Sequence, residues 1–189
     1  RNADIDMYDA KTAHQPYRVF HPEMHASVSA KQQLEIEMRR GMERGEFFLM
    51  YQPIVSLVSN DILGYEALAR WQHPEKGLVN PVEFIPLAEE TGLIIPLGEW
   101  ILREACHQMS GWELGDQDQS APSVNVNLSG KQLSQPALVS VIKEILEQSD
   151  LTPSRLKLEI TESAIIEDPK RIAGILHELK ALGVQICMD

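Results

Sequence analysis

This sequence has few cysteines and no long hydrophobic run. Its 189 residues contain no stretch of about 18 consecutive apolar residues, and the opening RNADIDMYDAK is too polar for a signal peptide. The two cysteines, Cys106 and Cys187, form no C-x-x-C pair, and no H-E-x-x-H spacing supports a zinc protease. A reduced, cytoplasmic setting is the expectation. Because the chain begins without Met, we expect it to be part of a longer protein, in which a membrane anchor is left open.

Basic residues are also scarce. Lys and Arg number 17 against 28 Asp and Glu, which gives a formal net charge of −11. Proteins that grip nucleic-acid polymers need a basic surface for the phosphates, so a nucleic-acid polymer is not an expected partner. If the partner is an anion, metal ions are the natural bridge to it.

Helices and strands follow one another in an orderly way from about residue 29. The stretch KQQLEIEMRRGMERGE predicts a helix that ends at a glycine. The stretches FFLMYQPIV and ILGYEALARW predict two strands, and the short link between them predicts a hairpin. Asn80 should cap a helix that begins at Pro81, with Glu83 in a reciprocal capping contact. A second helix should run from about Pro96 to Trp112.

The last third of the sequence alternates strands with helices. The predicted order is strand SVNVNLS, helix 137–148, strand RLKLEIT, helix 169–182 and strand VQICMD. Alternation at these lengths is typical of the α/β class and predicts a largely parallel sheet or a β/α barrel.

Polar side chains recur on one face of these strands. Successive residues of a strand point to opposite faces, so Glu66 and Arg70 share one face of their strand. Asn127, Glu159 and Asp189 lie on the polar faces of the three later strands, at or near the carboxyl ends. Active sites of β/α barrels gather at that end, so we expect these residues to converge there.

The converging groups offer only oxygen donors. Three carboxylates facing one space repel each other, and hard cations such as Mg²⁺ or Mn²⁺ relieve that repulsion and prefer these ligands. One or two such ions suit chemistry on a phosphate ester, and Arg70 could pair with a phosphate oxygen. The structural alternatives are solvated carboxylates at strand ends, an Arg70 that only neutralises Glu66, and a His73 that is a surface or capping group in a loop.

The residues around Glu66-Ala67-Leu68 closely resemble the EAL-domain family of bacterial cyclic di-GMP phosphodiesterases. The stretches that carry the resemblance are YQPIVSL, GYEALARW, FIPLAEETGLI, VNLSGKQL, LEITES and the closing MD. They stand in the family's order, and together they assign residues 29–189 to an EAL domain, about its N-terminal two-thirds.

The resemblance implies a modified TIM barrel whose first strand runs antiparallel to the second. It implies metal-dependent hydrolysis of cyclic di-GMP to linear pGpG in bacterial second-messenger signalling, with Mg²⁺ or Mn²⁺ as cofactor and two ions in the complete domain. It makes Glu66, Asn127, Glu159 and Asp189 metal ligands, with the three carboxylates as catalytic residues. Gln52 and Arg70 match substrate-contacting positions, and Glu162 is expected to support the ligands from behind. A homodimer is a further expectation.

The family pattern continues beyond Asp189 with a second Asp, a DFGTG-type loop, and a later Lys and Glu. The chain ends before barrel closure, so the fragment is expected to be impaired alone. Residues 1–28 resemble something else: ADIDMYDAK with Tyr17 and Phe20 looks like the C-terminal remnant of a GGDEF domain plus a linker. A parent protein would therefore carry GGDEF and sensory domains.

Two other functions stay open from the sequence. An EAL domain can act as a non-catalytic cyclic di-GMP receptor or a protein-interaction module; such members generally lose metal ligands, and the checkable ones are kept here. A generic metal-dependent barrel hydrolase is the other alternative, and it would accept simple phosphomonoesters.

Overall fold

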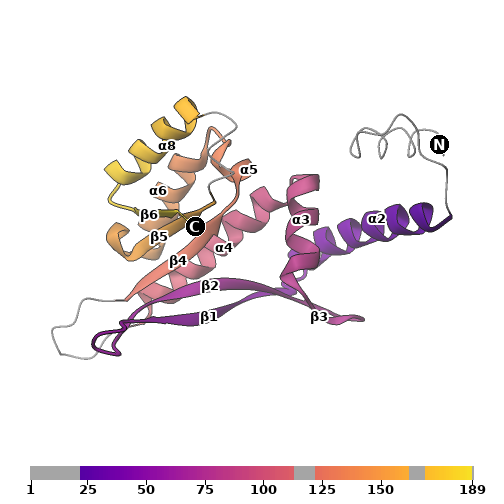
Figure 1. Cartoon of the computed structure of the whole chain (residues 1–189), viewed down its shortest axis with the longest axis horizontal. Helices are drawn as coiled ribbons and strands as arrows, with labels where there is room; N and C mark the ends of the chain where they lie inside the picture. The colour runs from indigo at the N-terminus through magenta and orange to yellow at the C-terminus, as the bar shows by residue number, and fades with distance from the viewer. Residues whose placement is uncertain (1–21, 113–121, 162–168, 189) are drawn as a thin grey trace. The chain divides into compact units, whose positions relative to one another are not determined.

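The computed structural model describes residues 22–112, 122–161 and 169–188 (Figure 1). Most of the stretch that resembles a GGDEF remnant, residues 1–21, and the predicted site residues Glu162 and Asp189 lie outside these ranges. Contacts divide the chain into two units, Arg1–Met38 and Arg39–Asp189, and the second is described below. Helix α2, Pro22–Glu43, begins in the first unit and ends in the second. It starts well before the predicted helix and ends close to the predicted end. Proline is well tolerated in a first helical turn, which allows the early start.

The predicted hairpin is confirmed. Strands β1 (Phe47–Val55) and β2 (Ile62–His73) pair antiparallel, and their register places Gln52 opposite Glu66. Strand β2 is longer than predicted, and the short strand β3 (Gly77–Val79), which was not predicted, pairs with its end.

His73 differs from the expectation of a surface group in a loop. It is the last residue of β2 and is only 4% exposed. Its Nδ1 accepts hydrogen bonds from the backbone N–H groups of Glu75 and Lys76, both at 3.1 Å. The capping role holds, and the ring lies edge-on to Trp71 with the ring centroids 5.3 Å apart.

Parallel strands extend the sheet from β2. Its order is β1-β2-β4-β5-β6, with β4 at Ser123–Leu128, β5 at Leu156–Ile160 and β6 at Gln185–Met188. The β2–β4, β4–β5 and β5–β6 pairs are all parallel, as predicted. This is the mixed α/β architecture expected for a modified barrel, and the barrel is not closed, because β1 and β6 are edges of the described sheet.

Helices connect the parallel strands. They are α3 (Pro81–Thr91), α4 (Ile94–Ser110), α5 (Gly130–Leu133), α6 (Leu138–Ser149), the 3₁₀ turn η1 (Pro153–Arg155) and α8 (Pro169–Ala181). Asn80 caps α3 by accepting the N–H of Val82 at 3.3 Å. The reciprocal capping pair predicted at Glu83 is found instead at Ser129 and Gln132, at the start of α5. Among the helices in the described ranges, none has both the length and the apolar character that crossing a membrane requires.

The apolar face of the central strands forms the core. Six side chains on β4 and β5 are at most 3% exposed: Val124, Val126, Leu128, Leu156, Leu158 and Ile160. Helix α4 runs along β4 and packs against α6 (Figure 1), and its own buried residues face this layer. Each fully buried aliphatic side chain contributes about 1.5–3 kcal/mol, so this layer carries much of the fold's stability.

Burial on this helix-covered side also suppresses ionisation. Cys106 of α4 is fully buried, and burial raises the pKa of its thiol to about 12. The pKa of Tyr51 on β1 is also raised to about 12, first by burial and then by the nearby charge of Glu104. Neither group is available as a nucleophile or base near neutral pH.

An aromatic cluster anchors the hairpin to α3. Phe47 and Trp71 stack with ring centroids 5.2 Å apart, and Phe84 meets Phe47 edge-on at 5.7 Å. Trp71 Nε1 donates a hydrogen bond to Glu46 Oε2 at 3.0 Å. A Cβ at Gly41 would lie 2.8 Å from that same oxygen and 2.9 Å from Trp71 Nε1, so any larger residue here would have to displace this pair. The cluster fixes the position of β2, the strand that carries Glu66.

Candidate functional site

Two asparagine–carboxylate pairs join the three central strands. In the register of the sheet, Glu66 of β2 is level with Asn125 of β4, and Asn127 is level with Glu159 of β5. The hydrogen bonds run diagonally instead. Asn127 Nδ2 donates to Glu66 Oε1 at 2.9 Å, and Asn125 Nδ2 donates to Glu159 Oε1 at 2.6 Å. The two carboxylates, which come from strands on either side of β4, are therefore both held by amides of β4.

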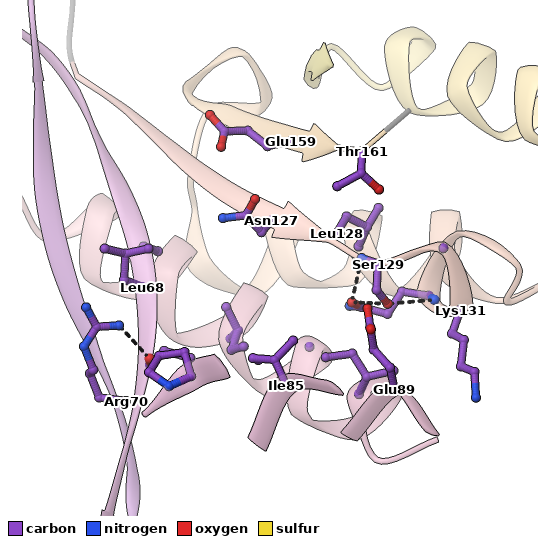
Figure 2. A pocket seen from close by; sticks show the side chains of 18 residues that line it. Leu68, Arg70, Ile85, Glu89, Asn127, Leu128, Ser129, Lys131, Glu159 and Thr161 are labelled. Atoms are coloured by element: carbon purple, nitrogen blue, oxygen red, sulfur yellow. Dashed lines mark hydrogen bonds between the residues drawn. The ribbon is translucent and has the colours of Figure 1, made fainter. Parts of the chain in front are cut away.

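A cavity of about 630 Å³ opens beside these pairs. Three predicted site residues line it, Arg70, Asn127 and Glu159, and Figure 2 shows them coming from β2, β4 and β5. Glu66 is outside the lining, but it is bonded to Asn127, which belongs to it. Three of the four predicted metal ligands are thus brought together with the predicted phosphate-binding arginine; the fourth, Asp189, lies outside the described residues.

Short elements on the other side complete the cavity wall. Ile85 and Glu89 of α3, and Ser129 and Lys131 at the start of α5, also line the cavity, and in Figure 2 the Lys131 side chain extends away from the three strands. Lys131 Nζ donates to the backbone oxygen of Glu90 at 3.3 Å, which ties α5 to the end of α3. The wall therefore mixes a hydroxyl, an ammonium group, a carboxylate and apolar surface.

A buried glutamine holds the start of α5 in place. Gln132 is 5% exposed, and its Oε1 accepts hydrogen bonds from Ser129 N at 3.1 Å and Ser129 Oγ at 3.0 Å. Its amide packs on α4 at Gly98, where an added Cβ would lie 1.9 Å from Gln132 Nε2. The S-x-x-Q spacing made this capping pair readable from the sequence. Its dependence on Gly98 involves a residue far away in the chain.

Arg70 and Gln52 stand differently with respect to the cavity. Arg70 is half-buried in its wall, and its Nη1 donates to the neighbouring backbone oxygen of Ala69 at 2.8 Å. Gln52 is exposed, and its pairing with Glu66 puts both side chains on one face of the hairpin. It does not line the cavity, so the structure brings Arg70 to the site and Gln52 only to the same face.

Sequence reasoning did not single out Asn125. The side chain is 4% exposed, and its Oδ1 has no hydrogen-bond partner within the described part of the chain. The available signal was alternation, because in SVNVNLS it shares a face with Asn127. What alternation does not give is the diagonal bond to Glu159.

The chemistry of the donors fits a hard divalent cation. Two carboxylates and a primary amide supply only oxygen ligands, which suit Mg²⁺ or Mn²⁺. Within the described ranges no group of three or more His, Cys, Asp or Glu side chains is close enough to hold a metal ion. The predicted fourth oxygen ligand, Asp189, falls immediately after β6.

Comparison with known proteins gives consistent results. The EAL domain family model matches residues 35–189. The bifunctional diguanylate cyclase/cyclic di-GMP phosphodiesterase MucR of Pseudomonas aeruginosa is 41% identical over 189 residues, 100% of this chain and 27% of MucR. The cyclic di-GMP phosphodiesterase PdeR of Escherichia coli is 33% identical over 190 residues, again 100% of this chain and 28% of the relative. The chain thus spans about a quarter of the length of these relatives.

Solved structures agree on the fold. The PaMucR phosphodiesterase in complex with c-di-GMP superposes with a TM-score of 0.77 at 43% identity, covering 83% of this chain and 63% of that one. The EAL enzyme Bd1971, in a form with cAMP and cyclic di-GMP bound, gives a TM-score of 0.78 at 31% identity, covering 86% and 45%. With the family match spanning most of its length, this chain belongs to the EAL domain family.

Proposed function

We propose that these residues form part of a metal-dependent phosphodiesterase that hydrolyses cyclic di-GMP to linear pGpG in bacterial second-messenger signalling. One observation carries the proposal: Arg70, Asn127 and Glu159, from three different strands, line one cavity, and Glu66 is hydrogen-bonded to Asn127 of that lining. The relatives MucR and PdeR, both named as cyclic di-GMP phosphodiesterases, support the choice of substrate.

Each residue has a proposed task. Glu66, Asn127 and Glu159 would hold Mg²⁺ or Mn²⁺ together with Asp189, and two ions are proposed for the complete site. A bound divalent ion would supply an activated water and stabilise the leaving oxygen. Arg70 would bind a phosphate oxygen of the substrate through its guanidinium fork.

Two predicted residues would act around this centre. Gln52, on the same face as Glu66, would contact the substrate from the hairpin. Glu162 would support the ligands by bonding to them. The three carboxylates would also orient the attacking water, with the amides of β4 keeping Glu66 and Glu159 in place.

Charge gives a reason for the cation. The chain carries a net charge of −11, the carboxylates of Glu89 and Glu159 line the cavity, and that of Glu66 is bonded to Asn127 of the lining. A cyclic dinucleotide brings two more negative charges, and like charges about 4 Å apart repel by several kcal/mol at a protein surface. Binding of cyclic di-GMP should therefore weaken when a chelator removes divalent ions.

We also propose a domain boundary near residue 29 and a reduced activity for the 189-residue chain alone. Residues 29–189 would form the EAL domain, and residues 1–28 would belong to a preceding GGDEF-like domain and linker. The family match beginning at residue 35, and the cyclase activity named for MucR, support this division. The 189-residue chain alone should be impaired, because the described sheet keeps open edges at β1 and β6 and such edges make a protein prone to associate.

Product analysis tests the proposal. The longest reading frame that contains these 189 residues would be incubated with cyclic di-GMP and Mg²⁺ or Mn²⁺, and the products separated by chromatography. We expect pGpG from the wild type, none from Glu66→Ala, and full activity from Glu178→Ala, a change at an exposed carboxylate of α8.

Two results would support the rival functions. Tight binding of cyclic di-GMP without pGpG would make the protein a receptor. Hydrolysis of simple phosphomonoesters without cyclic di-GMP binding would make it a general hydrolase.

A further inference from the structure

Asn125 occupies a position where an apolar residue would fit the fold. It lies in the middle of β4, between Val124 and Val126, and is 4% exposed. Its Oδ1 is buried without a partner in the part of the chain that the structure describes. A buried polar atom without a hydrogen bond destabilises a protein, whereas an apolar group of the same shape does not. Packing alone therefore does not account for an asparagine here.

The other end of the Asn125 amide has a specific contact. Nδ2 donates to Glu159 Oε1 at 2.6 Å, across the parallel pair of β4 and β5. A charge-assisted bond of this kind is among the stronger hydrogen bonds in proteins. It fixes one carboxylate oxygen and leaves Oε2 of Glu159, which has no hydrogen bond from the described residues, at the cavity wall.

We propose that Asn125 is a positioning residue: its amide orients the Glu159 carboxylate so that Oε2 is presented to the divalent cation. The inference rests on the proposed function, because it needs a cation at Glu159. Asn127 makes the matching bond to Glu66, but it is itself a proposed ligand, so Asn125 is the member of the pair that acts only through its neighbour.

Direct titration of Mn²⁺, by electron paramagnetic resonance or calorimetry and without substrate, tests the proposal. The protein is the longest reading frame containing this chain. Asn125→Leu removes the donor and keeps the branched shape with a larger volume, and Asn125→Ala is the second variant should leucine fail to fold. Ser123→Ala is the matched control, since it alters the same face of β4 at the opposite end of the strand, beside a different cavity.

We expect Asn125→Leu and Asn125→Ala to weaken Mn²⁺ binding by about 10–100-fold, the usual effect of losing a partner of a metal ligand. At saturating Mn²⁺, kcat should fall with little change in KM, because substrate binding through Arg70 is untouched. The melting temperature of Asn125→Leu should stay level or rise, which a merely structural asparagine would not allow. Ser123→Ala should match the wild type.

The outcomes separate this inference from the function beneath it. If the wild type binds Mn²⁺, Glu159→Gln loses it, and Asn125→Leu and Asn125→Ala bind like the wild type, only the positioning role is overturned. If the wild type binds no Mn²⁺, or Glu159→Gln binds it as well as the wild type does, both fail. If both Asn125 variants lose Mn²⁺ affinity and both also melt at a lower temperature than the wild type, the proposal is overturned as well.

Discussion

Alternate residues of β4 and β5 form two different faces, one that packs in the core and one that carries the polar site residues. The face toward α4 and α6 is aliphatic and almost fully buried. The other face carries Asn125, Asn127 and Glu159, joined by hydrogen bonds to each other and to Glu66. The aliphatic face is stabilised by buried apolar surface, to which many residues contribute. The polar face is stabilised by a few directional hydrogen bonds. Substitutions on the aliphatic face should therefore lower the free energy of unfolding. Substitutions on the polar face should mainly weaken metal or substrate binding.

The largest expected effect is on the apolar face. Leu158→Ala should lower the free energy of unfolding by about 2–5 kcal/mol, because Leu158 is fully buried and alanine leaves a cavity. Urea unfolding measures this change. The folded fraction should still bind Mn²⁺ with wild-type affinity, since Leu158 points away from Glu159. A large loss of affinity in the folded protein would break the separation of the two faces.

Arg70→Ala should have the next largest effect, and on binding. Hydrogen bonds to charged groups contribute about 1.5–3 kcal/mol, so the Kd for cyclic di-GMP should rise by about 10–100-fold. The free energy of unfolding should change little, because the Arg70 guanidinium bonds to the backbone carbonyl of its neighbour, Ala69. Calorimetry with Arg70→Lys as the matched variant sharpens the test: lysine keeps the charge and loses the fork, and should recover only part of the affinity.

Gly98→Ala should give a smaller effect that depends on its partner. The new Cβ would displace the Gln132 amide and break the capping pair that holds Ser129. Losing a cap costs about 1 kcal/mol, whereas alanine in place of a helical glycine gains up to about 1 kcal/mol. In a Gln132→Ala background only the gain remains. Thermal unfolding of the four proteins of this cycle should therefore show coupling, and simple additivity would contradict the packing described here.

The last effect should be a dependence of stability on alkaline pH. The pKa of Cys106 is raised to about 12 by burial, so the folded protein keeps a proton that the unfolded chain loses above about pH 9. The native state then binds more protons, and stability falls as pH rises from about 9 towards 12. The urea midpoint should drop between pH 8 and pH 10.5, and should drop less for Cys106→Ala. Tyr51, with its pKa also raised to about 12, adds to the remaining slope above pH 10.

Local patterns predicted the elements well. Period-2 alternation identified the strands and their two faces, and caps and glycines placed the ends of most helices within a few residues. The misses are of a different kind. Strand β3 is three residues long and exists because β2 offers it an edge, and the buried His73 belongs to that same pairing.

The site was predictable as a gathering of residues but not as a set of contacts. Alternation and the positions of the strand ends predicted that Glu66, Asn127, Glu159 and Arg70 converge. In the structure Arg70, Asn127 and Glu159 line one cavity, and Glu66 is bonded to Asn127. The diagonal bonds of Asn125 and Asn127 depend on side-chain torsions across two strand pairs, which no spacing rule encodes. The fit of Gln132 on Gly98 similarly joins α5 to α4, two helices separated by a strand.

A crystal structure with Mn²⁺ and cyclic di-GMP, phased to show the anomalous signal of the metal, tests the central claim most directly. We predict a manganese peak at coordination distance, about 2.1 Å, from oxygens of Glu66, Asn127 and Glu159, with the substrate phosphate against Arg70. The Asn125–Glu159 bond should persist in that complex. A peak elsewhere, or none beside these oxygens while the dinucleotide is bound, would contradict the assignment of the polar face as the metal site.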